Sequence, residues 1–430
     1  MIDKIKNILN SYNEIKDWKI IEKNSSSKEL FFIRKELDMN RATKTHEIIL
    51  TIYRDFEENE KKYKGHSTTN IHPTMTEEEI KTNIEDAYFS AKFVKNEYYP
   101  LAMPKENKNT LSNKFNEKSM EEWIPILTKE IFKNDKYKDG WINSAELFLT
   151  KNKIRLLNSN GIDVEYEKYD GMLEFIVNWK GNEEIELFEI INFSDYVEDF
   201  ISSKIKEKFE IAKYRAIAQS TPSVKDIPVL LTGSSVRNLF DYYVEQSNAA
   251  MVYQQYSNFK VGESIQGDKI NGDKINITLD PLMKNSTRAN LYDEDGIPLE
   301  KVELIKNGKL KRYSGNLRYS HYLNIEPTGN INNVVVECGN KTLDELKKEP
   351  HLELIEFSGF DVDTLTGDFG SEIRFGWYYD GKNKLPITGG SISGNLKEVQ
   401  NEMYLSKEYQ QINNFIGPKS IKIFNVSISG

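Results

Sequence analysis

The fold is decided by residues 145–193, AELFLTKNKIRLLNSNGIDVEYEKYDGMLEFIVNWKGNEEIELFEIINF, which we interpret as a series of β-strands. The series is interrupted at Asn160-Gly161, Asp170-Gly171 and Lys180-Gly181. Pairs of this kind allow the positive φ angles that tight hairpin turns require. We therefore predict an antiparallel meander whose strands end at these three pairs.

Helices are predicted on both sides of this meander. Residues 119–134 and a long amphipathic segment from about 196 to 218 flank it. Nearer the N-terminus, residues 2–12 have helical apolar spacing, and residues 45–55 read as a strand. A further helix follows the cap Thr76 and has acids in its first turn. Its predicted apolar face is formed by Ile80, Ile84, Ala87, Ala91 and Val94.

The chain divides into three predicted units: 1–105, 116–220 and 226–430, joined by a polar linker and by a hinge at 220–228. The third unit has one helix near 236–255 and then short strands punctuated by turns. These turns are predicted at Asp295-Gly296, Asn307-Gly308, Asp380-Gly381, Gly389-Gly390 and Gly394-Asn395. The predicted fold class is α+β: two N-terminal α/β subdomains with antiparallel sheet, then a sheet-rich C-terminal domain resembling a barrel or sandwich.

Composition excludes several functional classes. The 430 residues carry a formal charge of −9, which argues against nucleic-acid binding because that requires a basic face. The sequence has neither a signal-peptide pattern nor an apolar run long enough to span a membrane, so we expect a cytoplasmic protein without membrane contact. Cys338 is the only cysteine, which excludes an internal disulfide and a multi-cysteine metal site.

A self-sufficient catalytic centre is not evident. None of the five histidines has a second histidine four or five positions later, as a metalloprotease helix would. Residues 135–146 resemble a calcium loop, but Tyr137 stands where an oxygen ligand is needed, and the alternative is an ordinary helix-to-strand loop. Serine-rich stretches lack the Gly-x-Ser-x-Gly pattern, and no phosphate-binding loop is present.

Three C-terminal stretches occur in an order that resembles the TldD/PmbA family, and specifically its PmbA (TldE) branch. They are NLYDEDGIPLEKVELIKNGKLKRY (290–313), SGFDVDTLTGDFGSEIRFGWYYDGKNKLPITGGSISGNLKEV (358–399) and NNFIGPKSIKIFNVSISG (413–430). The family pattern has a D-x-x-G turn, an N-G hairpin, T-G-D-[FY], and G-N-L in the same order. Looser agreement comes from residues 85–101 and 156–167.

The resemblance implies that TldD-type subunits are zinc peptidases, with His-Glu-x-x-x-His on a helix early in the third domain and a later cysteine. PmbA-type subunits lack these residues and partner the active subunit. In this sequence the motif falls on LFDYYVEQSN, so Asp241 and Gln246 replace the histidines and Tyr242 replaces the glutamate. Leu239, Phe240, Tyr243 and Val244 would keep an apolar face for packing. We expect no cofactor in this chain and zinc only in a TldD-like partner.

The resemblance therefore predicts a non-catalytic subunit that pairs with a TldD-like zinc subunit and helps form a cleft for unfolded or modified peptides. The cleft wall is predicted near His321 and at Gly367, Asp368 and Phe369; alternatively, Gly367 and Gly370 only supply turn conformations and Asp368 caps backbone amides. Two other functions stay open. The chain could be a stand-alone homodimeric peptide-binding scaffold, or a hydrolase whose metal site joins His321 to distant carboxylates.

Overall fold

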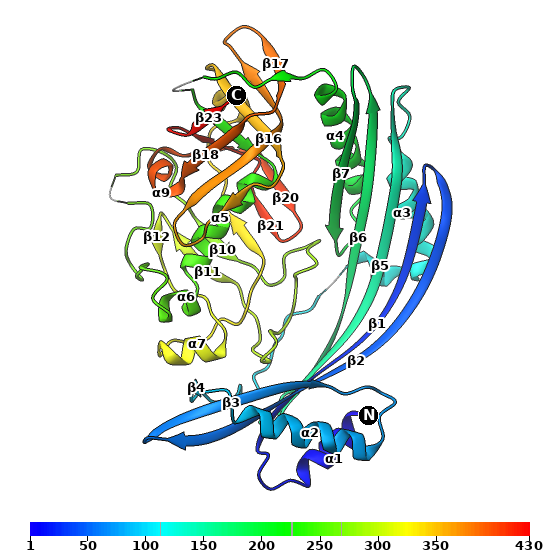
Figure 1. Cartoon of the computed structure of the whole chain (residues 1–430), viewed down its shortest axis with the longest axis vertical. Helices are drawn as coiled ribbons and strands as arrows, with labels where there is room; N and C mark the ends of the chain where they lie inside the picture. The colour runs from blue at the N-terminus through cyan, green and yellow to red at the C-terminus, as the bar shows by residue number, and fades with distance from the viewer. Residues whose placement is uncertain (112, 225–226, 268) are drawn as a thin grey trace.

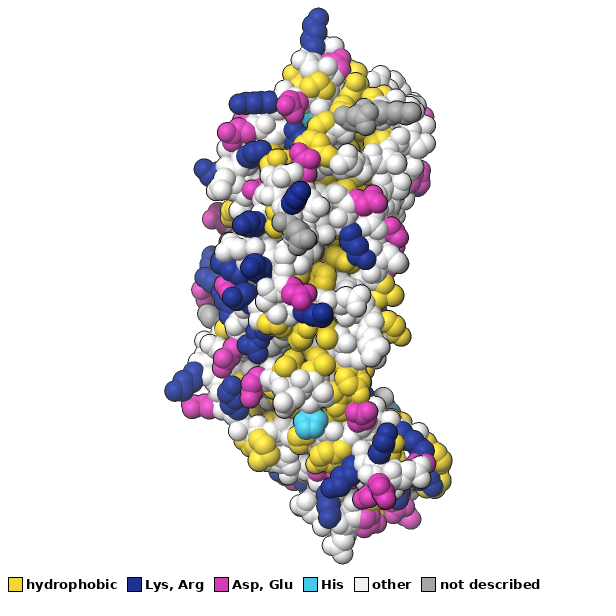
Figure 2. Space-filling model, turned by 90° about the vertical axis from the view of Figure 1, so that its left-hand side faces the viewer, with side chains coloured by type: hydrophobic (Ala, Val, Ile, Leu, Met, Phe, Trp, Pro, Cys, Tyr) yellow, Lys and Arg dark blue, Asp and Glu magenta, His cyan; other side chains and the backbone are white. Residues whose placement is uncertain are grey.

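The computed structural model describes residues 1–111, 113–224, 227–267 and 269–430. It confirms the predicted fold class: an N-terminal part with a large antiparallel sheet and paired helices is followed by a sheet-rich C-terminal part (Figure 1). No helix in the described ranges is long and apolar enough to cross a membrane. On the face shown in Figure 2, basic and acidic side chains are interspersed.

One seven-stranded antiparallel sheet organises the N-terminal part, in the order β4-β3-β2-β1-β5-β6-β7 (Figure 1). Its strands are β1 (Asp17–Ile33), β2 (Glu36–Glu58), β3 (Lys61–Asn70), β4 (Asn96–Glu97), β5 (Gly140–Asn158), β6 (Asp163–Lys180) and β7 (Glu184–Phe193). Residues 1–105 and 116–220 both contribute strands, because β1 pairs with β5 along its length. The three unit boundaries stay predictions, and residue 226, the predicted start of the third unit, lies outside the described residues.

Two pairs of helices cover one face of this sheet at its two ends. They are α1 (Ile2–Asn10) with α2 (Glu77–Ala91), and α3 (Met120–Phe132) with α4 (Phe200–Arg215). Trp18 and Ile20 of β1 lie in the core under the first pair, and Leu30 and Phe32 lie in the core under the second. All four positions are even-numbered, and side chains two residues apart in a strand point to the same face, so these four share one face of β1. The middle of that face is left between the two helix pairs.

The helix starts follow the local rules that predicted them. Thr76 accepts a hydrogen bond from the N–H of Glu79 while the Glu79 side chain accepts from the Thr76 N–H, which is a capping box. Residues 135–139 form an ordinary loop between α3 and β5, and Glu146 lies within β5. The calcium-loop alternative for this segment therefore has no exiting helix.

Asp170-Gly171 does not form a turn, which corrects the prediction. Both residues lie inside β6, where Asp170 pairs with Thr150 and Gly171 with Leu149. Glycine is needed there for space: a Cβ on Gly171 would lie 2.2 Å from Cε2 of Phe193. Asn160-Gly161 and Lys180-Gly181 do separate successive strands, and Gly161 has a φ of +96°.

Gly171→Ala should therefore lower the free energy of unfolding by about 2 kcal/mol, because the buried Phe193 ring must move away from the added methyl group. Chemical denaturation measures the loss. Gly359→Ala is the matched control, since an added Cβ there meets no atom within 4 Å, and we expect a change below about 0.5 kcal/mol. Equal losses in the two variants would contradict the close-approach explanation.

Two sheets enclose the core of the C-terminal part. The six-stranded sheet has β10 (Ile277–Leu279), β11 (Val302–Lys306), β12 (Lys309–Leu310), β13 (Val334–Val336), β20 (Tyr409–Ile412) and β21 (Phe415–Pro418). The second contains β8 (Gln219–Ser220), β9 (Val229–Thr232), β14 (His351–Phe357), β15 (Asp361–Val362), β16 (Asp368–Tyr379), β17 (Lys384–Thr388), β18 (Ser391–Asn395), β19 (Tyr404–Leu405), β22 (Ser420–Ile423) and β23 (Ser427–Ser429). Residues from both sheets form one apolar cluster.

The C-terminal helices are short. They are α5 (Ser234–Gln246), α6 (Ala249–Tyr253), α7 (Leu317–Tyr322), α8 (Leu343–Leu346) and α9 (Leu396–Val399), with 3-10 turns at Lys114–Glu117 and Gln400–Glu402. The single helix predicted over 236–255 is thus two helices. It breaks because Asn248 caps α6 through the N–H of Ala250 and forms a β-bridge with Ser314.

Four of the five predicted C-terminal turns have positive φ at glycine: Gly296, Gly308, Gly381 and the pair Gly389-Gly390. Gly394-Asn395 is the exception and corrects the prediction. It ends strand β18, which pairs with β16, and a Cβ on Gly394 would lie 2.6 Å from the Phe369 ring. Here too, close packing rather than turn geometry explains the glycine.

Candidate functional site

Helix α5 carries the three positions where the family resemblance places a metal motif. The helix lies in the C-terminal core, where Leu239, Phe240 and Tyr243 are almost fully buried. Phe240 stacks on Phe415 of β21 with ring centroids 6.1 Å apart. The Tyr243 hydroxyl donates to Oε1 of Gln400 at 2.9 Å. The apolar face predicted for this helix therefore anchors it between the two sheets.

The three motif positions point in different directions. Asp241 and Gln246 are five residues apart, which separates their side chains by about 140° around a regular α-helix. Gln246 is buried, and its Nε2 donates to the carbonyl oxygen of Thr364 at 2.7 Å. Tyr242 is 2% exposed and packs against Tyr243 and Phe259 at ring distances of 5.3 and 6.2 Å. Only Asp241 keeps substantial solvent contact.

Charged residues form a stripe along the outer face of α5 at intervals of four. Oδ2 of Asp241 lies 4.0 Å from Nε of Arg237, one turn earlier, and Glu245 lies one turn later. Partial burial raises the pKa of Asp241, and the Arg237 guanidinium opposes that rise. Burial also raises the pKa of Glu245, with a further rise from the neighbouring Asp241 carboxylate. Arg237 and Glu245 were not identified from the sequence, although their i,i+4 spacing could have revealed them.

These residues do not fit a zinc ion. A zinc site needs three or four converging nitrogen, sulfur or carboxylate ligands. The outer face of α5 offers two carboxylates, those of Asp241 and Glu245. The amide of Gln246 is occupied by the Thr364 carbonyl, and the Tyr242 ring is inside the core. Across the described ranges, no group of three or more His, Cys, Asp or Glu side chains is placed to hold a metal.

A tight turn covers the C-terminal end of α5. Asp363 Oδ1 accepts hydrogen bonds from the N–H groups of Leu365 and Thr366, at 2.7 and 3.1 Å. Gly367 has a φ of +85°, and its carbonyl accepts from the N–H of Leu396 at 2.7 Å. Together with the Gln246 bond to Thr364, these contacts fix the turn against α5 and α9.

The predicted cleft residues have different environments in this turn. Asp368 is exposed, and its carboxylate accepts from Asn395 Nδ2 at 2.7 Å and from Thr366 Oγ1 at 2.8 Å, which lowers its pKa. Phe369 is 4% exposed and stacks on Phe360 at 5.7 Å. The backbone amides are capped by Asp363 rather than Asp368. Gly370 lies in β16 without a positive φ, so it supplies no turn conformation.

His321 lies elsewhere, at the end of α7. Its side chain is exposed, and its ring centroid is 6.3 Å from that of Tyr322. Tyr322 in turn donates from its hydroxyl to the Glu97 carbonyl at 2.6 Å, so α7 contacts the N-terminal part. No hydrogen bond or ring contact of the described residues joins His321 to residues 367–369. The assignment of these four residues to one cleft stays a prediction.

Residues 224–430, which contain α5, the turn and α7, match the sequence model of the PmbA/TldA metallopeptidase C-terminal domain. This part of the chain therefore belongs to the TldD/PmbA family. The resemblance drawn from the ordered C-terminal motifs is thereby confirmed. The family match also places the α5 stripe and the 363–368 turn within its defining domain.

Curated relatives match this chain in part. An uncharacterized protein of Methanocaldococcus jannaschii is 24% identical over 62% of this chain and 65% of its own length. A protein named metalloprotease PmbA homolog, from Buchnera aphidicola, is 25% identical over 47% of this chain and 46% of its own length. The chain thus spans about half to two thirds of the length of these curated relatives.

The fold is shared over the whole chain with TldE from Thermococcus kodakarensis. The TM-score is 0.81, and the match covers 99% of this chain and 100% of that structure at 19% sequence identity. The chain therefore has the fold of this TldE structure, including the large N-terminal sheet.

Proposed function

We propose that this chain is a non-catalytic, TldE-like subunit that pairs with a TldD-like zinc subunit in a peptidase complex. The observation that carries the proposal is that the side chains of Asp241, Tyr242 and Gln246 point in different directions, on a helix whose apolar face is packed in the core. The scaffold of the metal helix is retained without a converging ligand set. Zinc, if present in the complex, would belong to the partner.

The substrate class that we propose is unfolded or modified peptide. The turn at 363–368 lies against the C-terminal end of α5, so it would border a cleft that α5 helps to form. Asp368 is an exposed carboxylate of this turn, whereas Gly367 and Phe369 would act by holding the turn in place. His321 would border the cleft from α7. An extended peptide can bind a sheet-rich domain with little sequence selectivity, because main-chain hydrogen bonds supply the affinity.

The test combines purification with activity. A tagged chain purified from its own cells should recover a TldD-like protein, and the pair should cleave an unfolded protein while the isolated chain does not. A chelator should abolish cleavage by the pair, and elemental analysis should find zinc in the pair but below stoichiometric amounts in the isolated chain. The matched control is the TldD-like chain alone.

Three results would contradict the proposal. Chelator-sensitive cleavage by the isolated chain, or stoichiometric zinc bound to it, would indicate a metal site assembled from other residues. Recovery of the tagged chain only with copies of itself would favour the homodimeric scaffold. Asp241→Ala provides an internal check, since loss of activity in that variant would assign chemistry to the α5 stripe.

A further inference from the structure

The outer edge of β2 is unpaired over much of its length. Strand β3 pairs with β2 only from Ile49 to Glu58, whereas β1 pairs with β2 from Glu36 to Tyr53. Residues 36–48 therefore have a neighbouring strand on one side only, and Figure 1 shows this stretch of β2 along the outside of the sheet. The side chains of this stretch are mostly exposed.

One hydrogen bond shows which main-chain N–H and C=O groups of β2 point outward along this edge. The carbonyl of Ile48 accepts from the N–H of Ile71 at 2.8 Å, on the side of β3. N–H and C=O groups alternate sides with a period of two residues, and the β1–β2 register is regular from Met39 to Tyr53. The N–H and C=O groups of Asn40, Ala42, Lys44 and His46 therefore point outward, with no strand to receive them.

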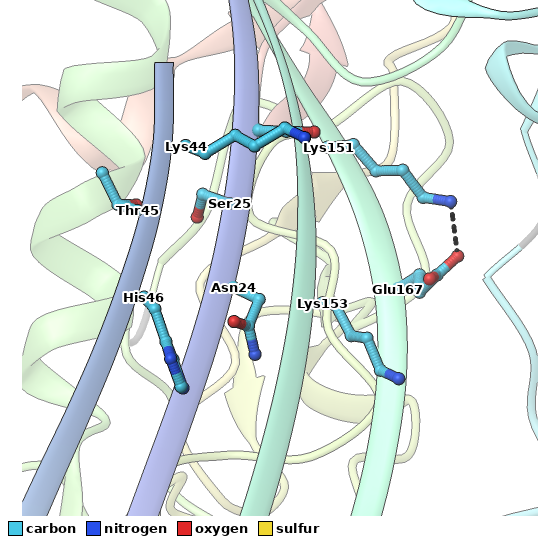
Figure 3. A pocket seen from close by; sticks show the side chains of 9 residues that line it. Asn24, Ser25, Lys44, Thr45, His46, Lys151, Lys153 and Glu167 are labelled. Carbon is cyan, nitrogen blue, oxygen red and sulfur yellow. Dashed lines mark ion pairs between the residues drawn. The ribbon is translucent and has the colours of Figure 1, made fainter. Parts of the chain in front are cut away.

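The side chains at these positions point to the face of the sheet on which both helix pairs lie, and those of Lys44 and His46 lie in the middle of that face, between the two pairs. Asn24 and Ser26 have the same parity as Ile20 and Leu30, which lie under the helices. Asn24 is opposite His46, and Ser26 is opposite Lys44. A cavity of about 350 Å³ lies on this face, and its lining side chains come from the neighbouring strands β2, β1, β5 and β6 (Figure 3). The cavity thus begins directly beside the unpaired edge.

The lining of the cavity is rich in lysine. Lys44, Lys151 and Lys153 are set against one lining carboxylate, Glu167. Lys151 pairs with Glu167 at 2.8 Å, and Lys153 pairs with Glu165 at 2.9 Å. Lys44, which is nearest the edge, forms no ion pair with any described residue. His46 is bound to Glu22 at 2.7 Å, which leaves the Lys44 ammonium as the available charge.

We propose that the unpaired edge of β2 binds an extended peptide as an added strand, with an acidic side chain of the peptide facing Lys44 over the cavity. Residues that pair directly across two strands place their side chains on the same face. A peptide bonded to Asn40, Ala42, Lys44 and His46 therefore directs alternate side chains toward the lysine-lined cavity. This site is on the N-terminal sheet, separate from α5, and it does not depend on the proposed zinc partner.

The chemistry selects an extended acidic peptide over other ligands. The main-chain groups of four alternating residues require a partner with the same spacing of donors and acceptors, which an extended polypeptide has. Lys151 and Lys153 are paired with glutamates, so the Lys44 ammonium is the lining charge that favours a negative side chain on the peptide. Natural proteins usually protect such edges with charged residues or bulges, and here the bulge lies at the far end, opposite Phe31 and Phe32.

Fluorescence anisotropy with labelled heptapeptides tests the proposal on the full chain. The probe alternates valine and glutamate; one comparison peptide has lysine in place of glutamate, and another is N-methylated at the residues that would bond to β2. We expect the glutamate peptide to bind at least about tenfold more tightly than either comparison peptide, since each lost hydrogen bond or charge contact weakens affinity severalfold.

Two variants with matched controls locate the site. Ala42→Pro removes an outward N–H without breaking the β1 ladder, and we expect at least about tenfold weaker binding, while Ala42→Thr stays within about twofold. Lys44→Glu should weaken the glutamate peptide at least about tenfold and strengthen the lysine peptide, whereas Lys16→Glu, an exposed control, should change neither by more than about twofold. Circular dichroism and the thermal midpoint verify folding of each variant.

Unchanged binding of the glutamate peptide to Ala42→Pro or to Lys44→Glu would overturn the proposal. So would a preference for the lysine peptide in the unaltered chain, or no binding of any probe. Sedimentation provides a further check: a dimer that Ala42→Pro dissociates, in a chain that binds no probe, would mean that the edge is an interface between copies. These binding measurements do not depend on peptidase activity of the proposed complex. The β2-edge proposal can therefore be contradicted without contradicting the proposed subunit function, and the reverse also holds.

Discussion

The double variant Glu189→Gln/Glu356→Gln should lose about 3 kcal/mol of unfolding free energy, because it leaves the Lys208 ammonium buried without a counter-charge. Lys208 lies on α4 with its side chain 4% exposed. Its Nζ is 2.5 Å from Glu189 of β7 and 2.8 Å from Glu356 of β14. The cluster therefore connects the N-terminal sheet, its covering helix and the C-terminal part, and chemical denaturation measures its contribution.

Two comparison variants separate burial of charge from loss of contacts. Lys208→Met removes the ammonium, and the two carboxylates are 39% and 29% exposed and can be hydrated, so we expect a smaller loss of about 1 kcal/mol. Glu207→Gln breaks an exposed pair with Lys204 and should cost no more than about 0.5 kcal/mol. A loss in Lys208→Met equal to that of the double variant would contradict the explanation.

The pH dependence of this cluster follows from the sign of the shift. Burial acts to lower the pKa of Lys208, but Glu356 and Glu189 hold it above its ordinary value of 10.5. A raised lysine pKa contributes stability that is fully present below the unfolded pKa and is lost as pH rises through the folded pKa. The contribution of Lys208 should therefore be constant at neutral pH and disappear only in strongly alkaline solution.

Asp293 is expected to make stability fall as pH rises through the weakly acidic range. Burial and the nearby Asp295 raise the pKa of Asp293 to about 7. Its Oδ1 accepts from the N–H groups of Asp295 and Ile297, both at 2.9 Å, whereas Oδ2 is buried without a hydrogen-bond partner among the described residues. Ionising this carboxyl in the folded chain is therefore unfavourable.

The free energy of unfolding is expected to fall as pH rises through the weakly acidic range. Between pH about 4 and about 7 the folded chain keeps a proton that the unfolded chain has released. Unfolding free energy should fall over this range by at most about 1.4 kcal/mol per pH unit, or about 4 kcal/mol in all. Above pH about 7 both states are ionised and this contribution to the slope ends.

Denaturation of the unaltered chain and of Asp293→Asn at four pH values between 4.5 and 7.5 measures this effect. Asparagine keeps the Oδ1 acceptor and cannot ionise, so its stability relative to the unaltered chain should increase as pH rises. Glu57→Gln, which removes an exposed carboxylate, is the control for surface charge. Parallel curves for the unaltered chain and Asp293→Asn would contradict the prediction.

Local sequence rules predicted the elements whose stabilising contacts are local. The capping box at Thr76 placed the start of α2 where it is observed, whereas the predicted apolar face ran on to Val94, beyond the last helical residue, Ala91. Caps and i,i+4 packing act within one or two turns, so the sequence nearby contains their cause. The prediction of one continuous helix over 236–255 is wrong at the break between α5 and α6. There Asn248 forms a β-bridge with Ser314, which is distant in the sequence.

Glycine was ambiguous because it serves two purposes. At Gly161 and Gly308 it permits a positive φ, and a turn was predicted correctly. At Gly171 and Gly394 it leaves space for the rings of Phe193 and Phe369, which are distant in the sequence. Only the packed structure distinguishes the two uses, since both place a glycine beside a polar residue. The sequence also did not indicate the buried lysines, whose carboxylate partners come from other strands.

The sequence by itself determined the family, the fold class and the identity of the residues at the metal-motif positions, because these depend on residue order and local periodicity. Tertiary structure decided what those residues do: Gln246 binds the Thr364 carbonyl, Tyr242 fills the core, and Asp241 faces Arg237. It also decided that two predicted units share one sheet whose β2 edge is left unpaired. Strand pairing and burial join residues far apart in the chain, so no local pattern records them.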